Sequence, residues 1–168
     1  MISLNYSGLQ EFIKKYGKVD DFTGGVSEDK VKETENKLQV PLPESYKWFL
    51  KNYGSGGSFG IDIIGYDFVG PSVVTATKDH QKYYGLIDGL VVIDDIDEFA
   101  YCLDTNKMKN GECPVIMWDN QEGYGRKLAD NFLDYFIEKL APYFYNLGIQ
   151  DCVGYMQERL DDLYGLEI

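Results

Sequence analysis

The stretch LQVPLPESYKWFLKNYGSGG, Leu38–Gly57, decides how this chain is organised. Proline disfavours helix in the residue before it, so Pro41 and Pro43 predict that one helix ends before them and that a second begins at Pro43. Gly54 is expected to end the second helix in the left-handed conformation, and the glycines around it turn the chain into a predicted strand at 59–66. The second helix carries one apolar stripe at helical spacing: Tyr46, Phe49, Leu50 and Tyr53.

Two helices are expected before this stretch, the first over 7–16 and the second after Ser27, which is suited to cap it. The second helix breaks a local rule, because Glu35 lies on the same face as the apolar residues Val31 and Leu38. A carboxylate on a buried face needs hydrogen-bond donors. We therefore expect Glu35 to accept hydrogen bonds from backbone N–H groups or a tyrosine hydroxyl in the following loop, and a ligand contact is the alternative.

The rest of the chain shows a mixture of strand and helix patterns. Asn110–Gly111 is a strong turn signal and predicts that a strand at 99–103 pairs with one at 114–118. The other elements expected here are a short strand at 72–77, a helix at 78–84, a buried strand at 90–93, a helix from 132 that ends at Pro142, and a further helical stripe at Ile149, Val153, Met156, Leu160 and Leu163. The predicted fold class is α+β, a single domain with an antiparallel or mixed β-sheet and helices packed against it.

Composition limits the classes of function. Hydrophobic residues are 44% and the formal net charge is −12, so the 168 residues can bury one full core, and a nucleic acid or an anionic membrane is disfavoured as a direct ligand. No stretch approaches the ~20 apolar residues of a membrane span, and there is no signal-peptide pattern, so we expect a cytoplasmic protein. The three cysteines, Cys102, Cys113 and Cys152, lack CxxC spacing and are expected to be reduced.

Motifs for catalysis or cofactor binding are weak. The glycine cluster near Gly54 follows a helix and precedes a predicted strand, the reverse of a phosphate-binding loop, and 104–115 lacks the ligands of a calcium loop. His80 is the only histidine and is expected on a helix surface beside Asp79, so a histidine-rich metal site is impossible. We expect no cofactor, no metal and no enzymatic activity. The remaining enzymatic alternative is a magnesium or acid–base site at Asp94, Asp95 and Asp97.

The distribution of acidic residues is more informative. From Tyr83 through Asn106 the chain contains no lysine or arginine. If the strand ends bring the acids of this interval and of its neighbour together, one edge of the sheet carries a negative field that speeds encounter with a basic protein; the alternative is a solvated rim. The residues predicted to bind a partner are Asp62, Asp67, Asp88, Asp94, Asp95, Asp97, Glu98 and Asp104. Nearby aromatic residues are candidate interface anchors or core residues: Tyr66, Phe68, Tyr83, Tyr84 and Tyr101.

The motif LPxSYKxFLxxYGxGG, which begins at Leu42, resembles the SUKH superfamily, which includes bacterial immunity proteins and a yeast regulator of cell-wall glucan synthesis. The segments FGIDIIGYDF, YYGLIDGLVVIDDIDEFAYCLDTNKMKNGECPVIMWD and NFLDYFIEKL extend the resemblance over 26–140. Residues 1–25 form an expected N-terminal helix and loop, and 143–168 form a C-terminal helical extension to which nothing is transferred. The resemblance implies that the motif maintains the fold, through Leu42, Pro43, Tyr46, Phe49, Leu50 and Gly57.

The resemblance also implies a function, that of an immunity protein, or antitoxin. Such a protein would bind and neutralise the C-terminal toxic domain of an LXG-type polymorphic toxin, a basic nuclease domain and specifically a ribonuclease, by protein–protein contact. The sequence leaves the oligomeric state open. A non-catalytic regulatory or scaffold protein related to the yeast regulator is the alternative, and an LXG toxin gene immediately upstream would discriminate between the two.

Overall fold

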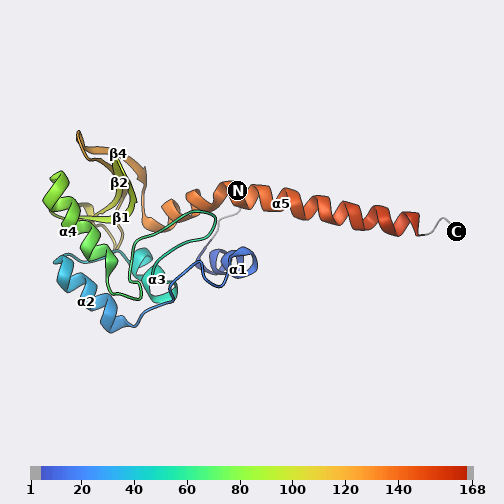
Figure 1. Ribbon diagram of the computed structural model, residues 1–168, viewed down its shortest axis with the longest axis horizontal. Coiled ribbons are helices and arrows are strands. Elements are labelled where there is room, and N and C mark those ends of the chain that lie inside the picture. Colours follow the sequence, from blue (N-terminus) through green and yellow to red (C-terminus); the bar gives the residue numbers. More distant parts are fainter. Residues whose placement is uncertain (1–4, 166–168) are drawn as a thin grey trace.

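The computed structural model describes residues 5–165, except for the side chains of 149, 151, 152, 163 and 164. Its strands form an antiparallel meander in the order β1-β2-β3-β4, which confirms the α+β class. Helix α4 packs against β1, while α5 starts beside the sheet and runs past α1, well beyond the rest of the molecule (Figure 1). The elements in chain order are α1 Tyr6–Tyr16, α2 Glu28–Leu38, α3 Glu44–Asn52, α4 Ser72–Tyr84, β1 Leu90–Ile96, β2 Phe99–Asp104, the 3-10 helix η1 Thr105–Lys107, β3 Val115–Asp119, β4 Gly123–Ala129 and α5 Phe132–Tyr164.

Several predicted elements are confirmed. Gly54 has a φ of 74° directly after α3, as expected for the residue that ends a helix. Strands β2 and β3 pair in antiparallel register, with Ala100 opposite Trp118. The turn between them has positive φ at both Asn110 and Gly111, 54° and 76°. The end of the second helix at Gly54 and the pairing of the two strands through the Asn110–Gly111 turn are therefore confirmed.

Two predicted strands are wrong. Residues 59–66 form a loop, because Phe59 and Gly60 both have positive φ, 61° and 79°, and only Ile63 makes a single bridge, to Gly56. Residues 72–77 belong to α4 rather than to a strand. The buried side chains of α4 follow a helical period that the strand interpretation overlooked: Val73, Val74, Thr77 and His80.

The structure also differs from prediction around the last helix. Helix α5 does not end at Pro142 but continues to Tyr164. Proline removes the donor for the carbonyl four residues earlier, and that residue, Glu138, is exposed, so water can satisfy the carbonyl. Strand β4 was not predicted, because its glycines and charges give it weak strand propensity; pairing with β3 holds it in place.

The hydrophobic core lies on both faces of the sheet. The larger part is enclosed by α3, α5 and one sheet face, and its fully buried members include Tyr46, Phe49, Ile93, Phe132 and Phe136. The smaller part lies on the other face and consists of Leu86, Leu90, Val92, Ala100, Cys102, Ile116 and Trp118. Burial raises the pKa of the Cys102 and Cys113 thiols, and both are free. The thiol of Cys152 lies outside the described side chains.

Glu35 behaves as the sequence predicts. Its Oε1 accepts a hydrogen bond from the Leu42 N–H at 2.9 Å, so the carboxylate ties α2 to the proline-rich link that follows. The Lys47 ammonium lies 3.9 Å from the same oxygen. The neighbouring Thr34, rather than Glu35, takes the fully buried position on α2 and donates to the Lys30 carbonyl. The carboxylate therefore has a structural role in the connection between the two helices.

Helix α3 receives its N-terminal cap from a distant part of the chain. Its N-cap residue is Pro43, whose side chain offers no acceptor. Instead, Glu112 accepts hydrogen bonds from the Ser45 N–H at 2.9 Å and the Ser45 hydroxyl at 2.7 Å, and the Gly111 carbonyl accepts the Glu44 N–H at 2.9 Å. A carboxylate at a helix N-terminus is favoured both by the free N–H groups and by the macrodipole. The β2–β3 hairpin thus fixes the start of α3.

A second set of contacts anchors the loop 59–66. The Tyr46 hydroxyl donates to the Ile64 carbonyl at 2.7 Å, and the Ile64 N–H donates to the Ile93 carbonyl at 2.8 Å. Ile93 lies where the pairing of β1 with β2 shifts register, so its carbonyl is free to turn outward to the loop. The Val92 N–H on the same strand donates to the Thr77 hydroxyl of α4 at 3.0 Å. Loop and helix together cover this edge of the sheet.

The cap supplied by Glu112 gives a stability prediction. Glu112→Ala leaves the Ser45 N–H and hydroxyl without their acceptor, and it should lower the free energy of unfolding by about 2 kcal/mol. Urea denaturation followed by tryptophan fluorescence measures this change. Glu122→Ala, at an exposed position, is the control and should change the value by less than ~0.5 kcal/mol. Equal effects of the two substitutions would show that the cap does not stabilise α3.

Candidate functional site

Three of the predicted acidic residues, Asp62, Asp67 and Asp95, line one hollow, which we call the acidic hollow. Its volume is about 670 Å³, and it lies between the loop 59–71, α4 and the end of β1, with Lys37 of α2 also in its lining. The Lys37 ammonium is paired with Glu33 Oε1 at 2.6 Å. The sequence interpretation missed a fourth carboxylate there, Asp79, which is exposed on α4. Residues 72–84 form one helix, and Asp79 follows Thr75 by four residues, so both side chains line the hollow from the same side of α4.

The loop that carries two of these carboxylates is held at several points. The Ser72 hydroxyl donates to the Gly65 carbonyl at 3.0 Å, and the Val73 N–H donates to the same carbonyl at 3.0 Å. On the other side, the Tyr66 N–H donates to the Gly54 carbonyl at 2.9 Å. The carboxylates are therefore presented on a backbone that is fixed to α3 and to α4, which reduces the entropy cost of binding a partner.

Asp94 and Asp95 contact different helices. The Tyr135 hydroxyl of α5 donates to the Asp94 carboxylate at 3.1 Å, whereas Asp95 Oδ1 lies 3.7 Å from His80 Nε2 of α4. Successive residues of a strand point to opposite faces, so these two carboxylates are not placed to bind one magnesium ion together, which is one form of the enzymatic alternative. Within the described residues, no group of three or more His, Cys, Asp or Glu is placed to hold a metal ion.

His80 is not on the helix surface, and that prediction is wrong. Its side chain is buried, Nδ1 lies 2.9 Å from the Ala76 carbonyl, and the ring packs beside Tyr84 with centroids 5.1 Å apart. The α4 helix turns this residue inward because it shares the buried period of Val73 and Thr77. Asp79, its neighbour, is exposed as predicted.

The other predicted acids lie elsewhere. Asp97 and Glu98 form the turn between β1 and β2 and line a separate hollow of about 380 Å³ with Asp119. Asp88 and Asp104 lie at the opposite end of the β1–β2 pair, where Leu90 is opposite Asp104. Asp104 is buried, accepts the Tyr124 hydroxyl at 2.6 Å and caps η1. The eight residues therefore do not form one continuous edge.

The candidate aromatic anchors also separate. Tyr66 and Tyr101 are partly buried and pack against the main core. Phe68 is 88% exposed and Tyr83 65% exposed, so both are accessible to a partner. On the C-terminal part of α5, apolar side chains are exposed at Tyr145, Val153, Met156 and Leu160, while the side chains of Ile149 and Leu163 lie outside those described.

The environment of Asp94 gives a pH prediction. Burial raises the pKa of the Asp94 carboxyl, against the opposing effects of the Tyr135 hydroxyl and Lys139. The carboxyl therefore keeps its proton to a higher pH in the folded protein than in the unfolded chain. The stability from this group is present below the unfolded pKa and is lost as pH rises through the folded pKa. Asp94→Asn still offers an oxygen to Tyr135 and carries no charge. It should match the wild type at low pH and exceed it near neutrality, by less than ~1 kcal/mol.

Urea denaturation of both proteins across the acidic range measures the difference. A difference in unfolding free energy that stays constant with pH, or that favours the wild type at neutral pH, would contradict this account of Asp94.

Comparison with protein-family models gives two matches. The SUKH_5 family, described as SMI1-KNR4 cell-wall, matches residues 9–141, which include most of α1, helices α2 to α4, the whole sheet and the start of α5. A family of uncharacterised conserved proteins, DUF2164, matches residues 122–166, which include β4 and the whole of α5, so the two matches overlap over 122–141. No helix in the described part of the chain is long and apolar enough to cross a membrane. Since the first match extends over well more than half of the sequence, the chain belongs to the SUKH_5 family and with it to the SUKH superfamily.

Proposed function

We propose that this protein is an immunity protein, which binds the C-terminal toxic domain of a cognate polymorphic toxin and blocks it by occupying its substrate-binding surface. The observation that carries the proposal is the acidic hollow of a SUKH fold, in which the loop presents Asp62 and Asp67, helix α4 presents Asp79, and the end of β1 presents Asp95. The sequence resemblance to the Bacillus antitoxin YobK supports a toxin of the LXG type. No cofactor takes part in this mechanism.

Electrostatics favour a basic nuclease domain, and a ribonuclease in particular, as the partner. A protein that binds RNA carries lysine and arginine where the phosphates lie. The formal net charge of −12 attracts such a domain, and the carboxylates of the acidic hollow set its orientation. Ion pairs formed there would engage the lysine and arginine side chains of the toxin that must bind its substrate. Binding of the immunity protein would therefore itself inhibit the toxin. The complex forms in the cytoplasm, where the toxin would otherwise reach its substrate.

Co-expression tests this function. The toxin's C-terminal domain, taken from an LXG gene immediately upstream, is expressed in cells with and without this protein, and growth and co-purification are scored. Rescue with a stable complex is expected. Continued killing with the protein well expressed and folded would contradict the proposal and favour a regulatory or scaffold role.

The charge of the acidic hollow should act mainly on the association rate. Asp62→Lys combined with Asp79→Lys reverses two exposed carboxylates and should slow association with the toxin domain about tenfold at low salt. Wild-type association should itself slow as salt rises towards physiological strength, because surface charges are then screened. Stopped-flow or biosensor kinetics at several salt concentrations give both results.

A matched control distinguishes an effect of the position of the reversed charges from an effect of the change in net charge. Asp161→Lys combined with Asp162→Lys changes the net charge equally at exposed positions near the far end of α5 (Figure 1). This variant should associate at nearly the wild-type rate. Equal slowing by the two double variants would show that only the overall charge matters and would remove the acidic hollow from the proposed interface.

A further inference from the structure

The turn Asp67–Gly70 places two neighbouring apolar side chains almost fully in water. Phe68 is 88% exposed and Val69 is 99% exposed. Single exposed apolar residues are ordinary on protein surfaces. This pair is different because it stands at the tip of one turn, directly beside the acidic hollow, and phenylalanine in solvent contributes nothing to the core.

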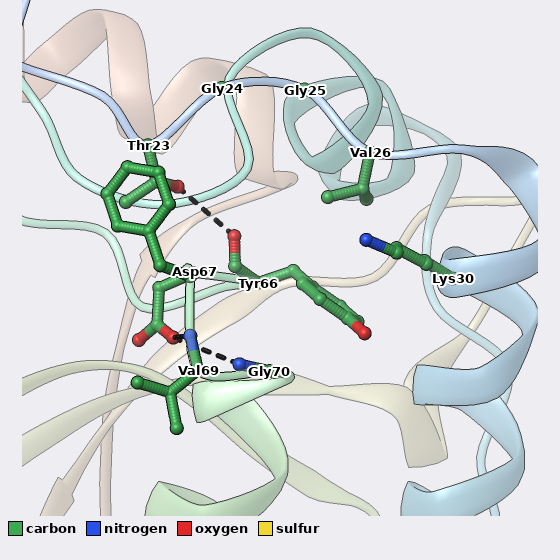
Figure 2. A pocket seen from close by; sticks show the side chains of 10 residues that line it. Thr23, Gly24, Gly25, Val26, Lys30, Tyr66, Asp67, Val69 and Gly70 are labelled. Atoms are coloured by element: carbon green, nitrogen blue, oxygen red, sulfur yellow. Dashed lines mark hydrogen bonds between the residues drawn. The ribbon is translucent and has the colours of Figure 1, made fainter.

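Hydrogen bonds of its own backbone and of the Asp67 side chain hold the turn together. Asp67 Oδ1 accepts hydrogen bonds from the Val69 N–H at 2.8 Å and the Gly70 N–H at 3.2 Å, as Figure 2 shows. The Asp67 N–H donates to the Gly70 carbonyl at 2.9 Å, and the Thr23 hydroxyl donates to the carbonyl of Tyr66 just before the turn at 3.2 Å. A side chain displayed on a fixed turn loses little freedom on binding, which suits an interface anchor.

The turn forms a ridge between two hollows. Asp67, Val69 and Gly70 line the acidic hollow on one side. They also line a second hollow of about 310 Å³ on the other side, where Lys30 and Tyr66 lie (Figure 2). A surface that fits this face must therefore receive a projecting apolar ridge in a cleft and place its own charged groups beside that cleft.

The charge of this face favours a basic partner over a second copy of the chain. A second copy of the chain would bring two proteins of formal charge −12 together. The linings of the two hollows beside the ridge carry four carboxylates against the two ammonium groups of Lys30 and Lys37, so like charges would predominate across such an interface. A partner with lysine and arginine around a cleft meets Asp62, Asp67 and Asp79 favourably at the same time as it receives the ridge. The substrate-binding site of a nuclease meets this requirement of charge, because it must hold the phosphates of its substrate with basic side chains.

We propose that Phe68 and Val69 are the apolar anchor of the toxin interface and enter the substrate cleft of the toxic domain, while the carboxylates of the acidic hollow pair with basic groups at its rim. This inference rests on the proposed function and identifies the face that performs it. Apolar and aromatic anchors at the centre of an interface govern dissociation, whereas charges at the rim govern association. The two parts of the surface therefore have different kinetic signatures.

The test compares Phe68→Ser combined with Val69→Ser against Tyr145→Ser combined with Val153→Ser, which removes an exposed aromatic and an exposed valine from α5. Biosensor kinetics with the purified C-terminal toxin domain give both rate constants. The Phe68/Val69 variant should raise the Kd by about thirtyfold or more, almost entirely through faster dissociation. The α5 variant should bind as the wild type does, and both variants should keep the wild-type unfolding midpoint.

The possible results distinguish a failure of the proposed anchor from a failure of the proposed immunity function. If the wild type binds the toxin domain and the Phe68/Val69 variant binds equally well, the anchor is wrong and the immunity function stands. A loss that appears only in the association rate would also overturn the anchor, because it would assign the turn to the charged rim. If the folded wild type neither binds nor protects, the function and the anchor fail together.

Discussion

The fold depends on the backbone of Ile64, which joins the helix of the central motif to the edge of the sheet. Its carbonyl accepts the hydroxyl of the fully buried Tyr46, and its N–H donates to the Ile93 carbonyl at the irregular position of β1. An unpaired buried polar group costs about 1–3 kcal/mol, so the loop has one favourable position once α3 and β1 are in place. Glu112 adds a second connection, from the β2–β3 hairpin to the N-terminus of α3.

This constraint also positions the surface proposed to bind a partner. The loop leaves Ile64 and passes Asp67, Phe68 and Val69 before it enters α4, so the acidic hollow and the apolar ridge are both consequences of where Ile64 is fixed. The motif at 42–57 and the part proposed to recognise a partner are thus close together in the chain but differ in role. Residues of the motif fill the core, while the exposed residues of the turn at 67–70 are the ones proposed to contact a partner.

The sequence predicted those parts of the structure that depend on local rules. Proline and glycine positions located α3, and Asn110–Gly111 located the β2–β3 turn, because each acts through its own backbone preference. The strand assigned to 59–66 failed because long-range hydrogen bonds to Tyr46 and Ile93 hold that segment as a loop. The tertiary packing likewise determines which acidic residues share a surface, and local sequence patterns do not report it. Asp79 lies near Asp62 because α4 packs beside the loop, whereas Asp104 is buried at the other end of the sheet.

Hydrogen–deuterium exchange of this protein, alone and mixed with the C-terminal domain of the proposed toxin, would locate the interface. Exchange should slow on binding mainly in 62–79, which includes the apolar ridge and the part of α4 beside the acidic hollow. The amides of 143–164 on the projecting part of α5 should exchange as they do in the free protein. Protection centred on α5 or on the β2–β3 hairpin, with 62–79 unchanged, would contradict the account.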